Sequence, residues 1–239
     1  MGIFRLTRFL HGLDSYERHK AVADFIESHH PGFCRILDVG GERRLTTNRL
    51  ALFLHDKKVD TLNVIAQTDI QVRGVTLPFE DNSYDIVVSI DTIEHIPKQD
   101  RQKAVEEYCR IAGKYVVVTG PVGNRLQRES EERLNREYVK LFGSNHHYLI
   151  EHLEYGDPTE EEMAELFKGR KIETVFFSDI GVAEKHIGTA FRFCPKIKII
   201  NKLFKLFYTA YTIIEYKKIE YLNAPLPTTR RFLVFLKND

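Results

Sequence analysis

The chain has 239 residues, 43% of them hydrophobic and 29% charged, and 35 basic residues face 34 acidic ones. This composition is typical of a globular protein with one sizeable domain. The balanced charge provides no overall field that would attract nucleic acid or a membrane surface. Cys34, Cys109 and Cys194 lie far apart, so we expect thiols in a reducing compartment rather than a disulfide framework or a zinc site.

The first residues, MGIFRLTRFL, contain no long apolar run before a small-residue cleavage site, which argues against a signal peptide. No stretch approaches the roughly 20 uninterrupted apolar residues that a membrane-spanning helix needs. We therefore expect a cytoplasmic protein.

Helices and apolar strands alternate along the first half of the chain. Residues 16–30 place Ala21, Val22, Phe25 and Ile26 on one helical face, and Pro31 and Gly32 end that helix. The strands expected next are 35–41, 59–66, 84–91 and 114–121, with a short one at 70–75, and the helices are 45–55 and 99–112, the latter capped by Gly113.

The second half has a different character. Residues 124–157 are rich in Arg, Glu, His and Tyr and contain no clean strand, whereas Pro158 and Thr159 followed by acids predict the start of a helix. Strands are expected at 172–180 and 230–237, with a helical stretch between them.

This alternation predicts the fold class. Near-continuous Val and Ile content in strands that alternate with helices is typical of a parallel sheet covered on both faces. Right-handed crossovers then give an α/β, doubly wound, mostly parallel sheet over a single domain, residues 1–239.

Polar residues follow the apolar run IVVSI, where no core requires them. Ligands of open α/β sheets bind beyond the carboxyl ends of the strands, so Asp91, Glu94 and His95 are candidates for a site. The same edge is expected to carry Gly40 and Gly41 after the first strand, and Gly120 and Pro121 after the fifth. Glycine there lets the backbone approach a ligand.

The segments ILDVGGE, LPFEDNSYDIVVSIDTIEHI and YVVVTGPVG resemble class I S-adenosylmethionine-dependent methyltransferases, and the LPF…EHI block is similar to the small-molecule branch that includes ubiquinone-biosynthesis-type enzymes. The resemblance implies a seven-stranded sheet with a closing antiparallel hairpin and S-adenosyl-L-methionine as cofactor. It places Asp38 and Gly40 at the methionine part of the cofactor, with Gly41 as a further cofactor-binding residue. It also places Leu77 and Phe79 near the adenine, and Ser89 and Asp91 beside the sulfonium, with Glu94 and His95 just beyond.

Three positions depart from the family pattern. Glu42 and Arg44 replace later glycines of the loop after the first strand, Asn63 stands where an acid usually holds the ribose, and Val75 replaces an acid before the LPF element. An amide can still accept one hydroxyl hydrogen bond, but without charge assistance. A degenerate scaffold that binds a partner without catalysis is the alternative.

His95 is the preferred general base for a hydroxyl acceptor, because imidazole titrates near neutral pH, and Glu94 is expected in the same pocket. A capping pair for the next helix is the competing interpretation. Methyl transfer itself mainly requires alignment of the nucleophile with an already activated methyl group.

The segment SNHHYLIEHLEYGDPT, residues 144–159, concentrates histidines, tyrosines and acids. Its spacing matches no standard metal site, so no metal is expected. The resemblance implies instead a specificity insertion over residues 124–170 that lines the acceptor pocket. Within it, His152 either points into the pocket as a further catalytic candidate or is a structural histidine bonded to the backbone. The clustered residues are His146, His147, Tyr148, Glu151, His152, Glu154 and Tyr155.

Residues 196–218 carry six lysines and one glutamate among apolar residues. They predict an extra amphipathic helix, which either packs against protein or makes peripheral contact with an anionic membrane, as a lipid-linked substrate would favour. The sequence does not determine the oligomeric state.

The sequence thus predicts methyl transfer to a small or lipid-linked acceptor, with oxygen favoured as nucleophile. SIDT follows the fourth strand in place of an Asn-Pro-Pro-Tyr-type motif, and with the balanced charge this argues against nucleic acid. A nicotinamide-dependent oxidoreductase would need G-x-G-x-x-G after the first strand, and GGERRL lacks it.

Overall fold

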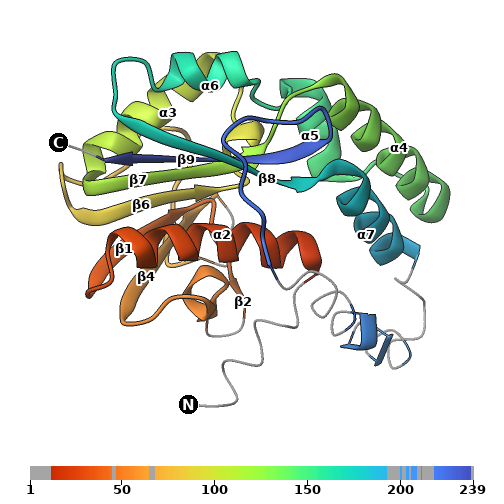
Figure 1. Ribbon diagram of the computed structural model, residues 1–239, viewed down its shortest axis with the longest axis horizontal. Coiled ribbons are helices and arrows are strands. Elements are labelled where there is room, and N and C mark those ends of the chain that lie inside the picture. The colour runs from red at the N-terminus through yellow and green to blue at the C-terminus, as the bar shows by residue number, and fades with distance from the viewer. Residues whose placement is uncertain are drawn as a thin grey trace.

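The computed structural model describes residues 12–44, 47–64, 68–192 and 218–237, together with 200, 203, 204, 206–208 and 211. Within these residues, seven strands form one sheet in the order β5-β4-β1-β6-β7-β9-β8 (Figure 1). The strands are β1 (Cys34–Val39), β4 (Lys57–Asn63), β5 (Ile70–Gln71), β6 (Tyr84–Ile90), β7 (Ala112–Pro121), β8 (Ile172–Asp179) and β9 (Thr229–Lys237).

The sheet is parallel except at one edge. β1, β4, β5, β6 and β7 run in one direction, whereas β9 pairs antiparallel with both β7 and β8. The doubly wound, mostly parallel seven-stranded sheet with a closing antiparallel hairpin is therefore confirmed.

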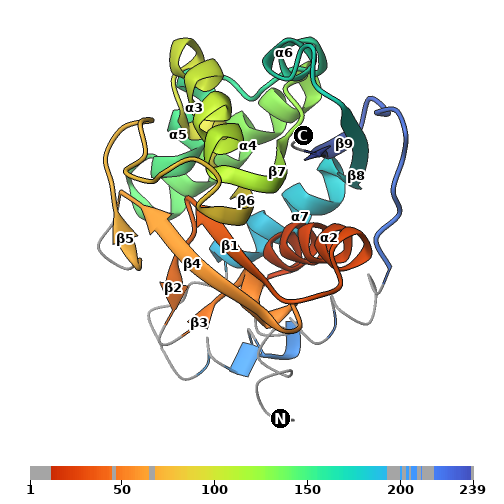
Figure 2. The same cartoon turned by 90° about the vertical axis from the view of Figure 1, so that its left-hand side faces the viewer.

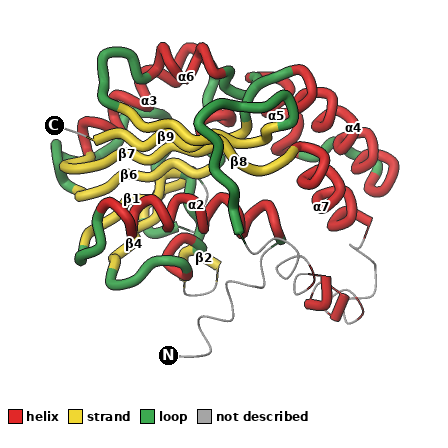
Figure 3. Tube along the Cα trace, in the orientation of Figure 1, coloured by secondary structure: helices red, strands yellow, loops and turns green. Residues whose placement is uncertain are grey.

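Helices cover both faces of this sheet (Figures 2 and 3). One apolar core lies between the sheet and α3 and α6, and a second lies between the sheet and α2. Neighbouring strand residues alternate between the two, as Leu37 and Ile36 do, because successive side chains of a strand point to opposite faces. The helices are α2 (Leu13–His29), α3 (Lys98–Ile111), α4 (Arg125–Phe142), α5 (His147–Tyr155), α6 (Glu160–Leu166) and α7 (Ile180–Arg192), with single 3₁₀ turns η2 (Leu50–Leu52) and η3 (Ile93–His95).

The helix expected at 45–55 is wrong. A small antiparallel hairpin, β2 (Arg43–Arg44) with β3 (Thr47–Asn48), and the η2 turn occupy this part of the chain. Leu50 and Phe53, two apolar residues of this stretch, are nonetheless buried against α2. Three to four apolar positions over so short a stretch are compatible with one turn as well as with a longer helix.

Two further boundaries differ from expectation. The strand β7 begins at Ala112, so Gly113 is a strand residue and does not cap α3. Gly120 and Pro121 likewise lie within β7 rather than after it, since β9 pairs with β7 as far as Pro121. The helix α7 was missed, and the helix expected over 196–218 falls mostly outside the described residues.

The region 124–170 forms α4, α5 and α6. Asn124 caps α4, its side chain accepting a hydrogen bond from the backbone N–H of Gln127 at 2.9 Å, and Thr159 caps α6 in the same way. In Figure 1, α4 and α5 stand at the end of the sheet reached by the carboxyl end of β7. Among the helices that the structure describes, none has both the length and the apolar character needed to cross a membrane.

Candidate active site

A cavity of about 970 Å³ opens beside the carboxyl ends of β1, β4 and β6. Its walls come from the turn after β1, the end of β4, the segment from Ile90 to Pro97, and α5. This volume lies at the upper end of the range of about 300–1,000 Å³ common for small-molecule and cofactor sites. The cavity occupies the place where open α/β sheets bind ligands.

The turn after β1 requires its two glycines. Gly40 has φ +84°, and its N–H donates to the carbonyl of Leu62 at 2.7 Å. A Cβ at this position would lie 2.0 Å from Oγ1 of Thr92, and a Cβ on Gly41 would lie 2.3 Å from Oδ2 of Asp38. Side chains are therefore excluded, and the backbone itself forms this wall of the cavity.

Asp38 presents a buried acceptor to the cavity. Its side chain is only 2% exposed; Oδ2 accepts a hydrogen bond from Nδ2 of Asn48 at 2.7 Å, while Oδ1 has no hydrogen-bond partner among the described residues. Burial raises the pKa of Asp38 to about 7, against the lowering effect of the Asn48 hydrogen bond. A cationic or N–H-bearing ligand group at Oδ1 would complete this site.

Asn63 supports the glycine turn. Its Nδ2 donates to the carbonyl of Gly40 at 2.7 Å, and its Oδ1 accepts from the N–H of Val64, also at 2.7 Å. Both ends of the amide are thus engaged within the protein, although the residue lines the cavity.

Asp91 lies in the cavity wall within a cluster of charges. Its carboxylate pairs with Arg18 of α2 and with Arg231 of β9, whose Nη2 lies 2.9 Å from Oδ2. Arg231 also donates to Oδ1 of Asp14 at 2.7 Å, as Arg230 does at 3.1 Å. Despite burial, which opposes it, Arg18 and Arg231 hold the pKa of Asp91 well below its usual range. Asp91 thus stays ionised.

The other residues that the resemblance assigns to the cofactor divide into two groups. Leu77 lines the cavity. Phe79 packs edge-on against Tyr84, with ring centroids 5.4 Å apart, and Ser89 is fully buried within β6; neither belongs to the cavity wall.

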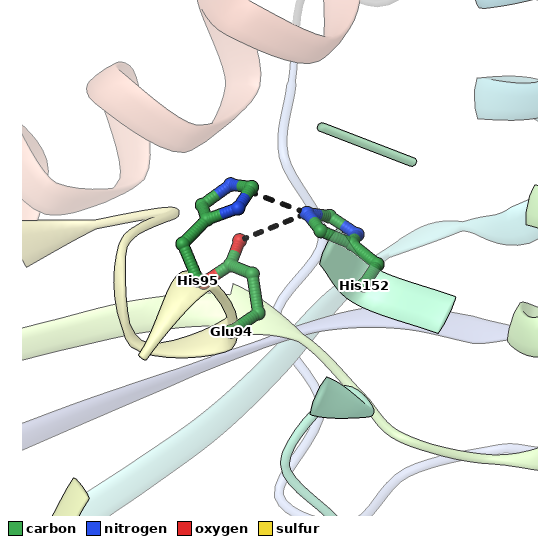
Figure 4. A group of neighbouring side chains, drawn as sticks. All are labelled: Glu94, His95 and His152. Atoms are coloured by element: carbon green, nitrogen blue, oxygen red, sulfur yellow. Dashed lines mark hydrogen bonds and ion pairs between the residues drawn. The ribbon is translucent and has the colours of Figure 1, made fainter. Parts of the chain in front are cut away.

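Glu94, His95 and His152 come together at the far end of the cavity (Figure 4). The η3 turn directly after β6 carries Glu94 and His95, and α5 packs against that turn and brings in His152. Nε2 of His152 lies 3.3 Å from Nε2 of His95 and 4.0 Å from Oε1 of Glu94. Glu94 is fully buried, and neither of its carboxylate oxygens has a hydrogen-bond partner within the described structure.

Carboxylates hold the outer nitrogens of both imidazoles. Nδ1 of His95 lies 2.7 Å from Oε2 of Glu151, and Nδ1 of His152 lies 2.7 Å from Oε1 of Glu131 and 3.4 Å from Oδ1 of Asp157. These contacts place the proton on Nδ1 of each ring and turn each Nε2 toward the cavity.

The environments of the three groups move their pKa values apart. Burial, helped by the charge of Asp91, raises the pKa of Glu94 to about 8. Burial and the neighbouring His152 lower the pKa of His95 to about 4. Against burial, the hydrogen bond to Glu131 and the nearby carboxylates raise the pKa of His152 to about 9. Such divergent shifts in one cleft are typical of functional sites.

The histidine-rich segment contributes most of its polar residues to this end of the cavity. His146, His147, Tyr148 and Glu151 line it, whereas Glu154 and Tyr155 do not. Sequence reasoning missed Glu131, Arg18 and Arg231, because each acts across elements far apart in the chain. An Asp-x-x-x-Arg spacing on a helix, as at Asp14 and Arg18, was the one local signal.

Comparison with known proteins gives one match to a family model and several matches to solved structures. Residues 47–115 match the family model described as a methyltransferase domain. No curated protein is similar to the chain in sequence. The fold is shared with several solved structures at low identity.

One is a sarcosine dimethylglycine methyltransferase candidate from Galdieria sulphuraria, with 15% identity and a TM-score of 0.57 over 95% of this chain and 87% of that one. A second is the MccD protein, with 12% identity and a TM-score of 0.52 over 96% and 100% of the two chains. A third, a phosphoethanolamine N-methyltransferase from Haemonchus contortus, was solved with phosphomonomethylethanolamine and S-adenosylhomocysteine; it shares 17% identity and a TM-score of 0.52 over 92% and 52% of the chains. Residues 47–115 thus match a methyltransferase domain, and the fold around them is one that these solved structures share.

Proposed function

We propose that the protein transfers the methyl group of S-adenosyl-L-methionine to an oxygen of a small acceptor. One observation supports this most directly: a single cavity runs from the glycine turn and Asp38 to Glu94, His95 and His152. A cofactor and an acceptor can therefore meet without leaving the protein. When bound, the cofactor supplies an activated methyl group, so the protein's task is alignment and exclusion of water.

The cofactor end of the cavity fits the group that the resemblance places there. Gly40 and Gly41 leave room for close backbone approach, and Oδ1 of Asp38 is a buried acceptor in need of a donor. The ammonium group of the methionine part would supply that donor in charge-assisted form. Leu77 offers an apolar wall for the adenine.

The acceptor end is formed by α5, within the region 124–170 that we assign as the specificity insertion. His95, whose pKa burial lowers to about 4, stays neutral and can accept a hydrogen bond from an acceptor hydroxyl, which favours oxygen over carbon as nucleophile. A ubiquinone-type or lipid-linked acceptor, with membrane contact through 196–218, remains a prediction, because that segment lies mostly outside the described residues.

Calorimetric titration with S-adenosylhomocysteine tests the proposal, with NADH titrated in parallel. We expect the first to bind and the second not to bind. Asp38→Ala should weaken binding by about 1–3 kcal/mol, because the ligand loses a buried charge-assisted hydrogen bond. If S-adenosylhomocysteine does not bind at high micromolar concentration, the methyl-transfer proposal is refuted, and a scaffold that binds a partner without catalysis is the function left.

Gly41→Ala tests the same end of the cavity by adding one methyl group, without a change in charge or in hydrogen-bonding groups. The new Cβ would lie 2.3 Å from Oδ2 of Asp38, so the buried carboxylate must move. We expect a loss of about 1–3 kcal/mol in stability, typical of overpacking, together with weaker S-adenosylhomocysteine binding. Gly169→Ala, a left-handed glycine in the turn after α6, from which no residue lines the cavity, is the control: it should lower stability but leave binding unchanged. Equal affinities for the wild type and Gly41→Ala would contradict the placement.

A scaffold without catalysis is the second candidate, and the position of Asn63 favours it. Because both ends of this amide already bond within the protein, at most one lone pair of Oδ1 is left to accept from a ribose hydroxyl. The binding experiment distinguishes the two candidates.

A further inference from the structure

We propose that Glu94, His95 and His152 form a binding site for one divalent transition-metal ion. The three offer one carboxylate oxygen and two imidazole nitrogens, and the ligand atoms all lie within 4.8 Å of one another. The metal site does not depend on the proposed methyl transfer. It differs from the expectation drawn from the sequence, where the spacing of the histidines matched no standard metal site. That spacing could not reveal the site, because His152 follows His95 by 57 residues.

The separation of the two imidazoles suits a shared ion. Their Nε2 atoms, 3.3 Å apart, both point into the same space (Figure 4). Two nitrogens bound at about 2.0–2.1 Å to a tetrahedral ion would themselves lie about 3.3 Å apart. With hydrogen held on each Nδ1 by a carboxylate, both Nε2 atoms are the positions open to a metal, and binding would displace the proton that His152 carries on Nε2.

Glu94 supplies the second line of evidence. Its carboxylate is fully buried, and both oxygens lack a hydrogen-bond partner in the described part of the chain. A buried carboxylate without partners is costly, and a cation is the usual remedy. Because no hydrogen bond restrains it, the carboxylate is free to close the 4.0 Å that separate it from His152 to a ligand distance.

The surroundings match those of histidine ligands in metal sites. Such histidines donate their other ring N–H to a carboxylate, which fixes the ring and raises its basicity. His95 does this to Glu151 and His152 to Glu131, each at 2.7 Å, and Asp157 adds a further negative charge near His152. Four carboxylates thus surround two imidazoles, an arrangement that favours a cation.

The donor set indicates which ion binds. Two imidazoles and one carboxylate suit Zn²⁺, Co²⁺ or Fe²⁺, whereas Mg²⁺ prefers oxygen ligands alone. Three protein ligands leave a coordination position open, and all three residues line the cavity. If the proposed methyl transfer is correct, an acceptor oxygen would take that position, where a metal ion lowers the pKa of a bound hydroxyl.

Metal titration of the full chain, produced without a histidine tag and treated with a chelator, tests the site. We expect Zn²⁺ to bind with a stoichiometry of one in calorimetry, and Co²⁺ to give the visible absorption of a four-coordinate ion. Mg²⁺ should give neither heat nor a shift in Tm. Glu94→Gln and His152→Ala should each weaken Zn²⁺ binding at least roughly 100-fold, since loss of an outer-shell partner alone costs about 10–100-fold. If circular dichroism shows that either variant is unfolded, His95→Gln, at the partly exposed side of the site, replaces it.

His30→Ala, at the opposite end of α2 from the cavity, is the control and should bind Zn²⁺ like the wild type. Asp38→Ala separates this proposal from the methyl-transfer proposal, because it should lose affinity for S-adenosylhomocysteine yet retain the metal. Failure of both Zn²⁺ and Co²⁺ to bind at high micromolar concentration would overturn the site. So would binding that Glu94→Gln and His152→Ala leave intact.

Discussion

Replacing Asp91 with asparagine is expected to lower the free energy of unfolding by about 3–5 kcal/mol, the range for removing one partner of a buried ion pair. Asp91 pairs with Arg18 and Arg231, and the Arg231 side chain is fully buried. Without the Asp91 charge, the cluster retains three arginines against Asp14 alone. Asparagine preserves the side-chain shape and tolerates the φ of +46° at this position, so the change removes little except charge.

Urea unfolding followed by circular dichroism measures this effect. Glu184→Gln provides the matched control, because Glu184 accepts two hydrogen bonds from Arg133, both at 2.8 Å, on an exposed surface. We expect that substitution to cost less than about 1 kcal/mol, as solvent-exposed ion pairs generally do. Similar losses for Asp91→Asn and Glu184→Gln would show that the buried cluster is no more important for stability than a surface pair.

Asp38→Asn is expected to stabilise the ligand-free protein at alkaline pH. Burial raises the folded-state pKa of Asp38 to about 7, against an unfolded value of about 3.9. A carboxyl whose pKa is raised by folding contributes stability below its unfolded pKa, and that contribution disappears as the pH rises through the folded pKa. The advantage of Asp38→Asn over the wild type should therefore grow by roughly 2–3 kcal/mol between about pH 5 and pH 8.

Thermal and urea unfolding at several pH values measure this difference. The free energy of unfolding of Asp38→Ala should depend on pH as that of Asp38→Asn does. It should be lower than that of Asp38→Asn by the same amount at every pH, because the Asn48 side chain loses its acceptor. Both variants should bind S-adenosylhomocysteine more weakly, so stability and binding would change in opposite directions for Asp38→Asn. Parallel pH profiles for the wild type and both variants would mean that Asp38 is not buried as a neutral acid.

The strands and the end of the cavity at the glycine turn were accessible from the sequence because their signals are local. Runs of β-branched Val and Ile such as IVVSI favour a strand buried on both faces, and β6 is such a strand. The glycines after β1 and the acids after β6 follow those strands directly, so locating the strands also located Asp38, Gly40, Gly41 and Asp91. Errors fell where local signals were weak, as in 45–55, where a hairpin and one 3₁₀ turn replace a helix.

Side-chain partners required the tertiary structure. The sequence assigned Asp91 to the sulfonium and Asn63 to the ribose, and nothing local indicates that Arg231, 140 residues away, pairs with Asp91 or that the Asn63 amide holds the glycine turn. Phe79 has the right type and position for an adenine contact, yet it packs against Tyr84. Which of several possible contacts a side chain makes depends on packing between elements, which local propensity does not contain.

The amino-acid pattern alone was enough to predict an α/β sheet and the edge at which the cavity lies, since strand periodicity and glycine turns act within a few residues, whereas the closing hairpin was expected from the family resemblance. The meeting of Glu94 and His95 with His152 depended on α5 packing against the η3 turn. A metal site or an ion cluster needs atoms within a few ångströms of one another, and only the folded chain brings residues so far apart in sequence to that distance.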